Sequence, residues 1–257
     1  MADKILLKEF YDGQVIRITL NAPKANILDA EMMEELQSAL DSFKSRPQIK
    51  LLQFAGTGNH FSFGASVAEH TKENAPQMLS QFHQLFFTLM DLAIPTAAIV
   101  SGQCLGGGLE LALMCNFLFC DQSAYLGQPE IMLGVFAPPA SLILPMKIGQ
   151  TRADEMLLSG KSIDAETADK FGLVTHLYEN SEALKSGVDA WVEKNILPKS
   201  ASSLRFAVKA GRHQFNLTLR KHLNNLATFY TTELMSSKDA NEGIKAFLEK
   251  RPPTWEN

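Results

Sequence analysis

The feature that most constrains this chain is a run of three glycines at positions 106–108, between an apolar segment and a helix-like one. The run reads Cys-Leu-Gly-Gly-Gly-Leu-Glu and places Glu110 in the first turn of the expected helix. Consecutive glycines let the backbone approach a ligand closely. The start of a helix offers unpaired N–H groups and the positive end of the helix dipole. The run therefore predicts a tight strand-to-helix turn suited to a developing oxyanion.

A second glutamate, Glu130, lies downstream in the segment Gly-Gln-Pro-Glu-Ile. Two carboxyl groups that converge on one spot can divide the roles of base and acid between them. In an apolar pocket, neighbouring carboxyl groups titrate apart, so one proton can be shared by the pair. We interpret Glu110 and Glu130 as catalytic, acting on a carbonyl compound through an enolate. Taken alone, Glu110 would better fit an exposed helix residue and Glu130 a turn residue.

Strand-like and helix-like patterns alternate through the first part of the chain. The strand-like segments are 15–20, 51–55, 96–100 and 117–120, and the helix-like segments are 29–43, 75–92 and 109–114. This alternation is typical of an α/β core with largely parallel strands. After Pro145 the pattern changes to helices. The sequence therefore predicts an α/β core of residues 1–195 and a helical C-terminal extension of residues 196–257.

Charge and composition argue against several classes of protein. A net charge of −4 and a pI of about 5.9 leave no basic stripe for nucleic acid, so no nucleic-acid partner is expected. No apolar run approaches the ~18–20 residues that span a bilayer, so no membrane is expected. Neither a metal-ligand spacing nor a dinucleotide fingerprint occurs, so no metal or cofactor is expected.

The three cysteines are Cys104, Cys115 and Cys120, an odd number without a C-x-x-C spacing. Their apolar surroundings predict buried free thiols rather than disulfides. The first residues, Met-Ala-Asp-Lys, lack the apolar stretch of a signal peptide. A reducing, cytoplasmic location is therefore expected.

Motifs in a fixed order resemble the crotonase (enoyl-CoA hydratase/isomerase) superfamily over nearly the whole chain. They lie at residues 23–26, 61–66, 106–110, 127–134, 159–160, 165–174 and 242–251. The resemblance implies the ClpP/crotonase fold, a core of repeated β-β-α turns with C-terminal helices that trimerise. It also implies a homotrimer or homohexamer with an acyl-CoA substrate. CoA would then be part of the substrate rather than a cofactor.

The resemblance also implies roles for individual residues. The backbone N–H groups of Ala65 and Gly107 would form the oxyanion hole, and Glu110 and Glu130 match the two glutamates of true hydratases. By position, the residues that would line the adenine and pantetheine path are Lys24, Ala25, Asn26, Ala65, Ser66 and Val67. A neighbouring subunit would reach the nucleotide end through Phe247 and Lys250. Two N–H donors can stabilise a thioester enolate without a metal, and losing one donor can cost ~3–4 kcal/mol of barrier.

Two departures from the usual family pattern point to a particular substrate. Ser66 replaces a common aspartate, which we expect to change loop hydrogen bonds rather than chemistry. Residues 135–141 read Val-Phe-Ala-Pro-Pro-Ala-Ser in place of a glycine-rich stretch, so Phe136 and Pro138 would form a stiff, apolar wall. Together with Pro-Lys-Ala-Asn-Ile-Leu-Asp at 23–29, this segment resembles hydratases of cyclic dienoyl thioesters in anaerobic benzoyl-CoA degradation. The resemblance implies a 1,4-addition of water to cyclohexa-1,5-diene-1-carbonyl-CoA.

Three other functions remain open at this point. The first is a generic short-chain enoyl-CoA hydratase that adds water 1,2. The second is a thioester hydrolase, which could use the same oxyanion hole. The third is a non-catalytic protein that binds acyl-CoA or RNA. Isomerases and decarboxylases of the superfamily often lack one of the two glutamates, so the sequence favours them less.

Overall fold

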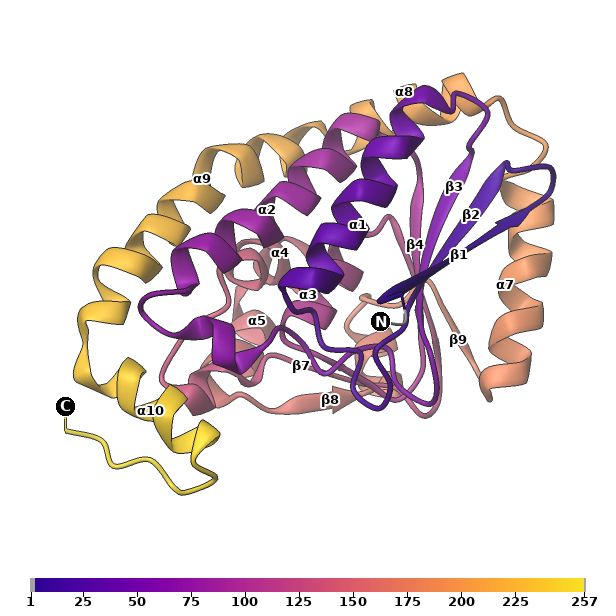
Figure 1. Cartoon of the computed structure of the whole chain (residues 1–257). Helices are drawn as coiled ribbons and strands as arrows, with labels where there is room; N and C mark the ends of the chain where they lie inside the picture. The colour runs from indigo at the N-terminus through magenta and orange to yellow at the C-terminus, as the bar shows by residue number, and fades with distance from the viewer. Residues whose placement is uncertain (1–2, 257) are drawn as a thin grey trace.

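In the computed structural model, which describes residues 3–256, six strands form the main sheet in the order β1-β2-β3-β4-β6-β9 (Figure 1). The strands are β1 Ile5–Phe10, β2 Val15–Leu20, β3 Leu51–Gly56, β4 Thr96–Val100, β6 Phe117–Asp121 and β9 His176–Tyr178. Strand β1 pairs antiparallel with β2, and the remaining neighbours are parallel. The parallel arrangement requires crossover connections, which the helices provide.

Helices cover both faces of this sheet (Figure 1). Helices α1 Ala30–Ser42 and α2 Ala75–Leu92 lie on one face, and α7 Ser181–Asn195 lies on the other. Successive side chains of a strand point to opposite faces. In β2, Ile16 accordingly packs in the cluster with α1 and α2, whereas Val15 packs in the cluster with α7. The inner strands β3, β4 and β6 are largely apolar on both faces because both faces are buried.

A second, three-stranded sheet follows the carboxyl ends of β4 and β6. It contains β5 Gln103–Leu105, β7 Tyr125–Gly127 and β8 Ser162–Asp164. Because β5 and β7 are parallel neighbours, the segments that leave them start from the same edge of the sheet. The glycine turn leaves β5 and the segment with Glu130 leaves β7. This pairing is why two glutamates distant in sequence can meet.

The remaining α-helices follow β5 along the chain and continue into its C-terminal part. The α-helices are α3 Gly107–Met114, α4 Pro138–Ile148, α5 Gln150–Ser159, α6 Ala165–Lys170, α8 Ala201–Gly211, α9 His213–Thr232 and α10 Lys238–Leu248. The 3-10 helices are η1 Phe43–Ser45, η2 Val67–His70, η3 Pro129–Leu133 and η4 Leu234–Ser236. Helix α9 packs on α4 and α2, so it buries Leu219, Leu223 and Tyr230 in the main core.

The predicted fold class is confirmed, because the protein is mixed α/β with a helical C-terminal part. Each predicted strand and helix of the first part is present, and Asp29 caps α1 by accepting a hydrogen bond from the Met32 N–H. The expectation of helices alone after Pro145 was wrong, since β8 and β9 follow it. Each has three residues, too few to show a strand period. The boundary between residues 195 and 196 stays a prediction.

Two further observations bear on the expectations from composition. Cys104, Cys115 and Cys120 are free and buried, as the sequence predicted. Among residues 3–256, no helix combines the length and the apolar character that crossing a bilayer requires.

The side chain of Asn26 joins the loops that follow β2 and β3. It is fully buried, and its Nδ2 donates to the carbonyl oxygens of Thr57, His60 and Phe61 at 3.0, 2.9 and 3.2 Å. Its Oδ1 accepts from the Ala22 N–H at 3.1 Å. These bonds hold the loop after β2 against the chain segment that leads to Ala65. A buried amide with this many partners specifies one loop conformation.

We expect Asn26→Ala to lower the free energy of unfolding by roughly 2–3 kcal/mol, because it leaves buried carbonyl groups without a donor. Urea unfolding followed by circular dichroism measures this loss. Asn59→Ala, at an exposed position of the same loop, is the matched control and should change stability by less than ~0.5 kcal/mol. Equal stability of the two variants would show that the Asn26 amide does not hold the loops.

Candidate active site

The glycine turn brings the Glu130 carboxylate against the backbone. Gly106 has φ +50° and ψ −128°, a conformation that side chains disfavour. A Cβ added there would lie 2.7 Å from Glu130 Oε1. A Cβ added at Gly108 would lie 2.6 Å from the Cβ of Ser62. The absence of side chains at these positions therefore lets two segments and a carboxylate occupy one small volume.

The two predicted oxyanion donors, Ala65 and Gly107, lie next to each other. The nitrogen of Ala65 is 3.2 Å from the place that a Cβ on Gly107 would take. Within residues 3–256, neither the Ala65 N–H nor the Gly107 N–H donates a hydrogen bond to the protein. Both residues line one cavity, and Gly107 opens α3, whose dipole adds positive potential there. The structure thus brings two free donors together at the start of a helix.

Both glutamates line the same cavity. Glu110 is buried, with 4% of its surface exposed, and its Oε1 accepts from the Ala140 N–H at 2.9 Å. Glu130 is half-buried. When the buried amide of Gln128 is oriented with its nitrogen toward Glu130, it donates to both carboxylate oxygens at 2.9 and 3.0 Å. Glu110 is therefore no exposed helix residue, and each carboxyl group has its own hydrogen-bond donor.

Burial changes the proton affinity of both carboxyl groups. Burial, with the nearby charge of Glu130, raises the pKa of Glu110 well above its ordinary value, although the Ala140 hydrogen bond opposes this. Burial raises the pKa of Glu130 to about 7. Hydrogen bonds from Gln128 favour the ionised form of Glu130. Glu110 therefore keeps its proton to higher pH than Glu130, and Glu130 becomes ionised as the pH rises through about 7.

The cavity is small and largely apolar apart from these groups. Its volume is about 70 Å³, and its apolar wall includes Met78, Leu79, Phe82, Phe136 and Pro138. Phe136 and Pro138 lie where the sequence placed them, beside the two glutamates. Low polarity strengthens electrostatic interactions inside such a space.

The structure distributes the other predicted binding residues over three places. Val67 lines the cavity, whereas Lys24 is exposed on the loop after β2. The sequence placed Asn26 along the adenine and pantetheine path. In the structure its side chain is buried and holds the loop instead. Phe247 and Lys250 are exposed at the end of α10 and do not line the cavity of their own chain. Ala25 and Ser66 are half-buried and do not line the cavity either.

The structure also adds three side chains that the sequence did not assign to the site. Gln128 contacts Glu130, as described above. His70 lines the cavity, and its Nδ1–H donates to the Ser66 carbonyl at 2.7 Å; burial lowers the pKa of its ring, so the ring is neutral. Tyr230 enters the cavity from α9. No local pattern marks His70 or Tyr230, because their roles depend on packing between distant segments.

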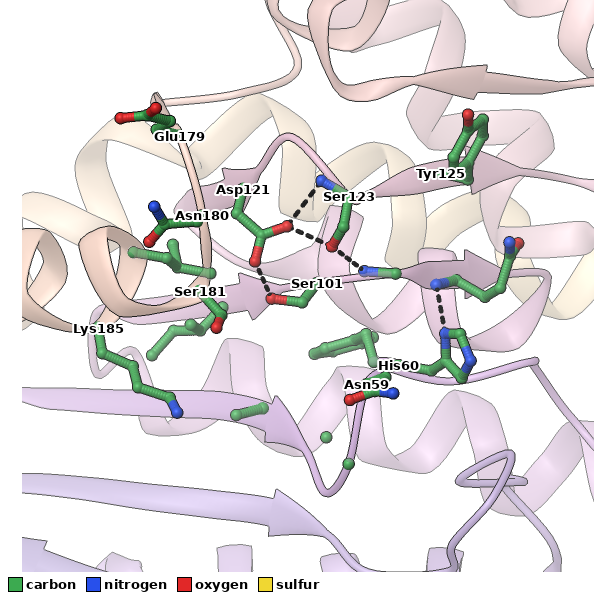
Figure 2. Close-up of a pocket in the computed structure, with 18 of the residues that line it drawn as sticks. Asn59, His60, Ser101, Asp121, Ser123, Tyr125, Glu179, Asn180, Ser181 and Lys185 are labelled. Atoms are coloured by element: carbon green, nitrogen blue, oxygen red, sulfur yellow. Dashed lines mark hydrogen bonds between the residues drawn. The ribbon is translucent and has the colours of Figure 1, made fainter.

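A larger cavity of about 690 Å³ lies elsewhere, at the carboxyl ends of β3, β4 and β6 (Figure 2). Its buried carboxylate, Asp121, accepts hydrogen bonds from the Ser101 and Ser123 hydroxyl groups and from the Ser123 N–H at 2.9 Å. These neighbours satisfy the carboxylate, and neither Glu110 nor Glu130 lines this cavity. The smaller cavity is therefore the candidate active site. Among residues 3–256, no three His, Cys, Asp or Glu side chains gather closely enough to hold a metal ion.

Comparisons with known proteins show which family this chain belongs to. Residues 11–257 match the family described as Enoyl-CoA hydratase/isomerase. A cyclohexa-1,5-dienecarbonyl-CoA hydratase of Thauera aromatica is 45% identical over 246 residues, covering 96% of this chain and 94% of that protein. A probable enoyl-CoA hydratase of Mycobacterium bovis is 34% identical, covering 95% of each chain. The crystal structure of an enoyl-CoA hydratase from Mycobacterium avium superimposes with a TM-score of 0.86 at 26% identity, over 99% of this chain and 100% of that one.

The raised pKa of Glu130 predicts how stability depends on pH. Because the folded-state pKa of about 7 exceeds the ordinary value of 4.5, the folded protein holds an extra proton between these values. The stabilisation of the folded state by this proton is complete below about pH 4.5 and is lost as the pH rises through about 7. The parent protein should therefore lose stability between pH 4 and pH 8 that Glu130→Gln keeps. Over this range, the free energy of unfolding of the variant should rise by ~1–3 kcal/mol relative to that of the parent protein.

Urea unfolding of both proteins at the two pH values measures this gain. Glu73→Gln, at an exposed position before α2, is the matched control and should show no such change. A Glu130→Gln variant that loses stability relative to the parent protein as the pH rises would contradict the assignment.

Proposed function

The chain belongs to the enoyl-CoA hydratase/isomerase family, and we propose that it adds water 1,4 to cyclohexa-1,5-diene-1-carbonyl-CoA. It is an acyl-CoA hydratase, a lyase. The product would be 6-hydroxycyclohex-1-ene-1-carbonyl-CoA. The observation that carries the proposal is the convergence of two free N–H donors and two unlike carboxyl groups on one cavity. The name of the Thauera aromatica relative supports the choice of substrate.

The residues would perform the reaction as follows. Ionised Glu130 takes a proton from water, and the water oxygen bonds to the ring carbon β to the carbonyl. The electron pair moves to the thioester oxygen, where the N–H groups of Ala65 and Gly107 stabilise it. Protonated Glu110 delivers its proton to the far end of the diene, and the remaining double bond moves next to the thioester. Transfer of the proton from Glu130 to Glu110 restores the starting state.

The wall of the cavity supports a cyclic, apolar acyl group. Phe136 and Pro138 replace a glycine-rich stretch with bulky, stiff side chains. A flat ring offers two apolar faces that such a wall can contact, whereas a short linear chain would fill less of it. We further propose that Lys24, Ala25, Ser66 and Val67 line the CoA path, and that the reaction requires neither a metal nor a separate cofactor. This substrate would place the enzyme in anaerobic benzoyl-CoA degradation.

We also propose a homotrimer or homohexamer located in the cytoplasm. The C-terminal helices carry several large apolar side chains that the single chain leaves exposed, namely Phe206, Leu217, Phe229, Phe247 and Leu248. Large exposed apolar side chains on three successive helices are typical of surfaces that further subunits cover. Three free, buried thiols support a reducing location.

The first experiment offers crotonyl-CoA and cyclohexa-1,5-diene-1-carbonyl-CoA to the enzyme in buffer that contains EDTA. Mass spectrometry should show a rapid gain of one water on the cyclic diene. Glu110→Gln and Glu130→Gln should each lower turnover by ~10²–10⁴-fold, because each removes one partner of the proton transfers. The exposed Glu73→Gln is the matched control and should retain full activity.

Each contrary outcome identifies another function. A preference for crotonyl-CoA would favour a generic short-chain hydratase. Release of free CoA thiol would favour a thioester hydrolase. Full activity of either glutamine variant would contradict the mechanism. Acyl-CoA binding without any turnover would favour a non-catalytic binding protein.

Sedimentation analysis tests the proposed assembly. The parent protein should sediment with three or six times the mass of one chain. The double variant Phe206→Glu, Phe247→Glu should shift toward the monomer, because it places charges at two exposed apolar positions of the C-terminal helices. Leu158→Glu, at an equally exposed apolar position on α5, is the control. A monomeric parent protein at micromolar concentration would contradict the proposal.

A further inference from the structure

The hydroxyl group of Tyr230 is buried without a hydrogen-bond partner. Among residues 3–256, the buried side-chain atoms in this condition belong to Glu69, His83 and Tyr230. Of these three residues, Tyr230 alone lines the cavity that contains Glu110 and Glu130. Buried polar groups in folded proteins are almost always paired, so an unpaired one in an active site indicates a missing partner.

The surrounding structure fixes the position of this phenol ring. Tyr230 lies near the end of α9 and is 1% exposed. Its ring contacts Phe136 edge to face, with ring centroids 5.3 Å apart and an interplanar angle of 64°. Helix α9 itself packs on α4 and α2. Aromatic pairs in this arrangement restrict ring motion, so the hydroxyl keeps its place in the cavity.

The hydroxyl remains neutral at every pH at which the enzyme would work. Burial and the charges of Glu130 and Glu110 raise the pKa of Tyr230 above its ordinary value. A neutral phenol can donate one hydrogen bond and accept others. It can therefore bind an oxygen atom that also carries a hydrogen, such as that of water or an alcohol.

We propose that Tyr230 is a further catalytic residue, whose hydroxyl binds the oxygen of the attacking water and of the product alcohol. This inference rests on the proposed function. The ring of the acyl group is a hydrocarbon, and the thioester oxygen is assigned to Ala65 and Gly107. Among the polar atoms of the reaction, the oxygen of the attacking water is then left with Glu130 as its one assigned partner. Tyr230 would orient this water while Glu130 removes its proton.

This role predicts discrimination between ligands with and without the alcohol. The product carries the hydroxyl group, whereas cyclohex-1-ene-1-carbonyl-CoA lacks it and is otherwise the same. In a Glu110→Gln background, where bound product is dehydrated only slowly, the product should bind about tenfold more tightly than the analogue. Tyr230→Phe in that background should remove this preference and leave binding of the analogue unchanged. Isothermal titration calorimetry measures all four affinities.

Kinetics provides a second readout in the otherwise unmodified enzyme. Tyr230→Phe should lower kcat about tenfold and leave the KM for the diene within about twofold, because the diene has no hydroxyl group. Tyr178→Phe, which removes a hydroxyl from a tyrosine on β9 outside the cavity, is the matched control. Thermal unfolding checks that both variants are folded.

The results separate this inference from the proposed function. An unchanged kcat and an unchanged product preference in Tyr230→Phe would overturn the inference while leaving hydration intact. If Tyr230→Phe fails to fold, equal affinity of the Glu110→Gln enzyme for product and analogue would overturn it equally. A parent enzyme that hydrates neither thioester would instead overturn the proposed function, and with it the role of Tyr230 in that reaction.

Discussion

The site depends on the close approach of two backbone segments, residues 61–66 and 104–108. Ser62 forms a parallel bridge with Cys104, and the glycines beyond it leave no side chain between the segments. Ser62 would meet a Cβ at Gly108 at 2.6 Å, so a larger residue would force the segments apart. Their contact brings the N–H groups of Ala65 and Gly107 to one cavity. In the proposed reaction, this contact is what places two donors beside the developing oxyanion.

The site is assembled from groups that cost stability. Two carboxyl groups with raised pKa values are held in apolar surroundings, where a charge is poorly solvated. Gln128 and the Ala140 N–H offset part of this cost and also make the two carboxyl groups unlike. An unpaired phenol adds a further cost in the free enzyme. Such costs are expected where binding of a substrate supplies the missing partners.

The C-terminal helices belong to the site as well as to the surface. Helix α9 supplies Tyr230 and its contact with Phe136, which forms part of the apolar wall. The same region exposes the apolar side chains that we expect another subunit to cover. A domain boundary near residue 195 would therefore not separate the residues of the site from the residues of the expected subunit interface. A change in the packing of α9 would alter the cavity directly.

The sequence by itself determined four strands of the main sheet (β2, β3, β4 and β6), the helices that alternate with them, the glycine turn and the two glutamates. Each of these can be recognised from a few adjacent residues, by a hydrophobic period, a glycine run or a carboxyl group. Only the tertiary structure decided that Asn26 holds loops together, that Gln128 faces Glu130 and that Tyr230 reaches the cavity. Strands of three residues, such as β8 and β9, also escaped prediction because they complete no pattern. The physical reason is that the burial, the hydrogen-bond partners and the pKa of a side chain depend on which distant segments meet. A local sequence pattern does not identify those segments.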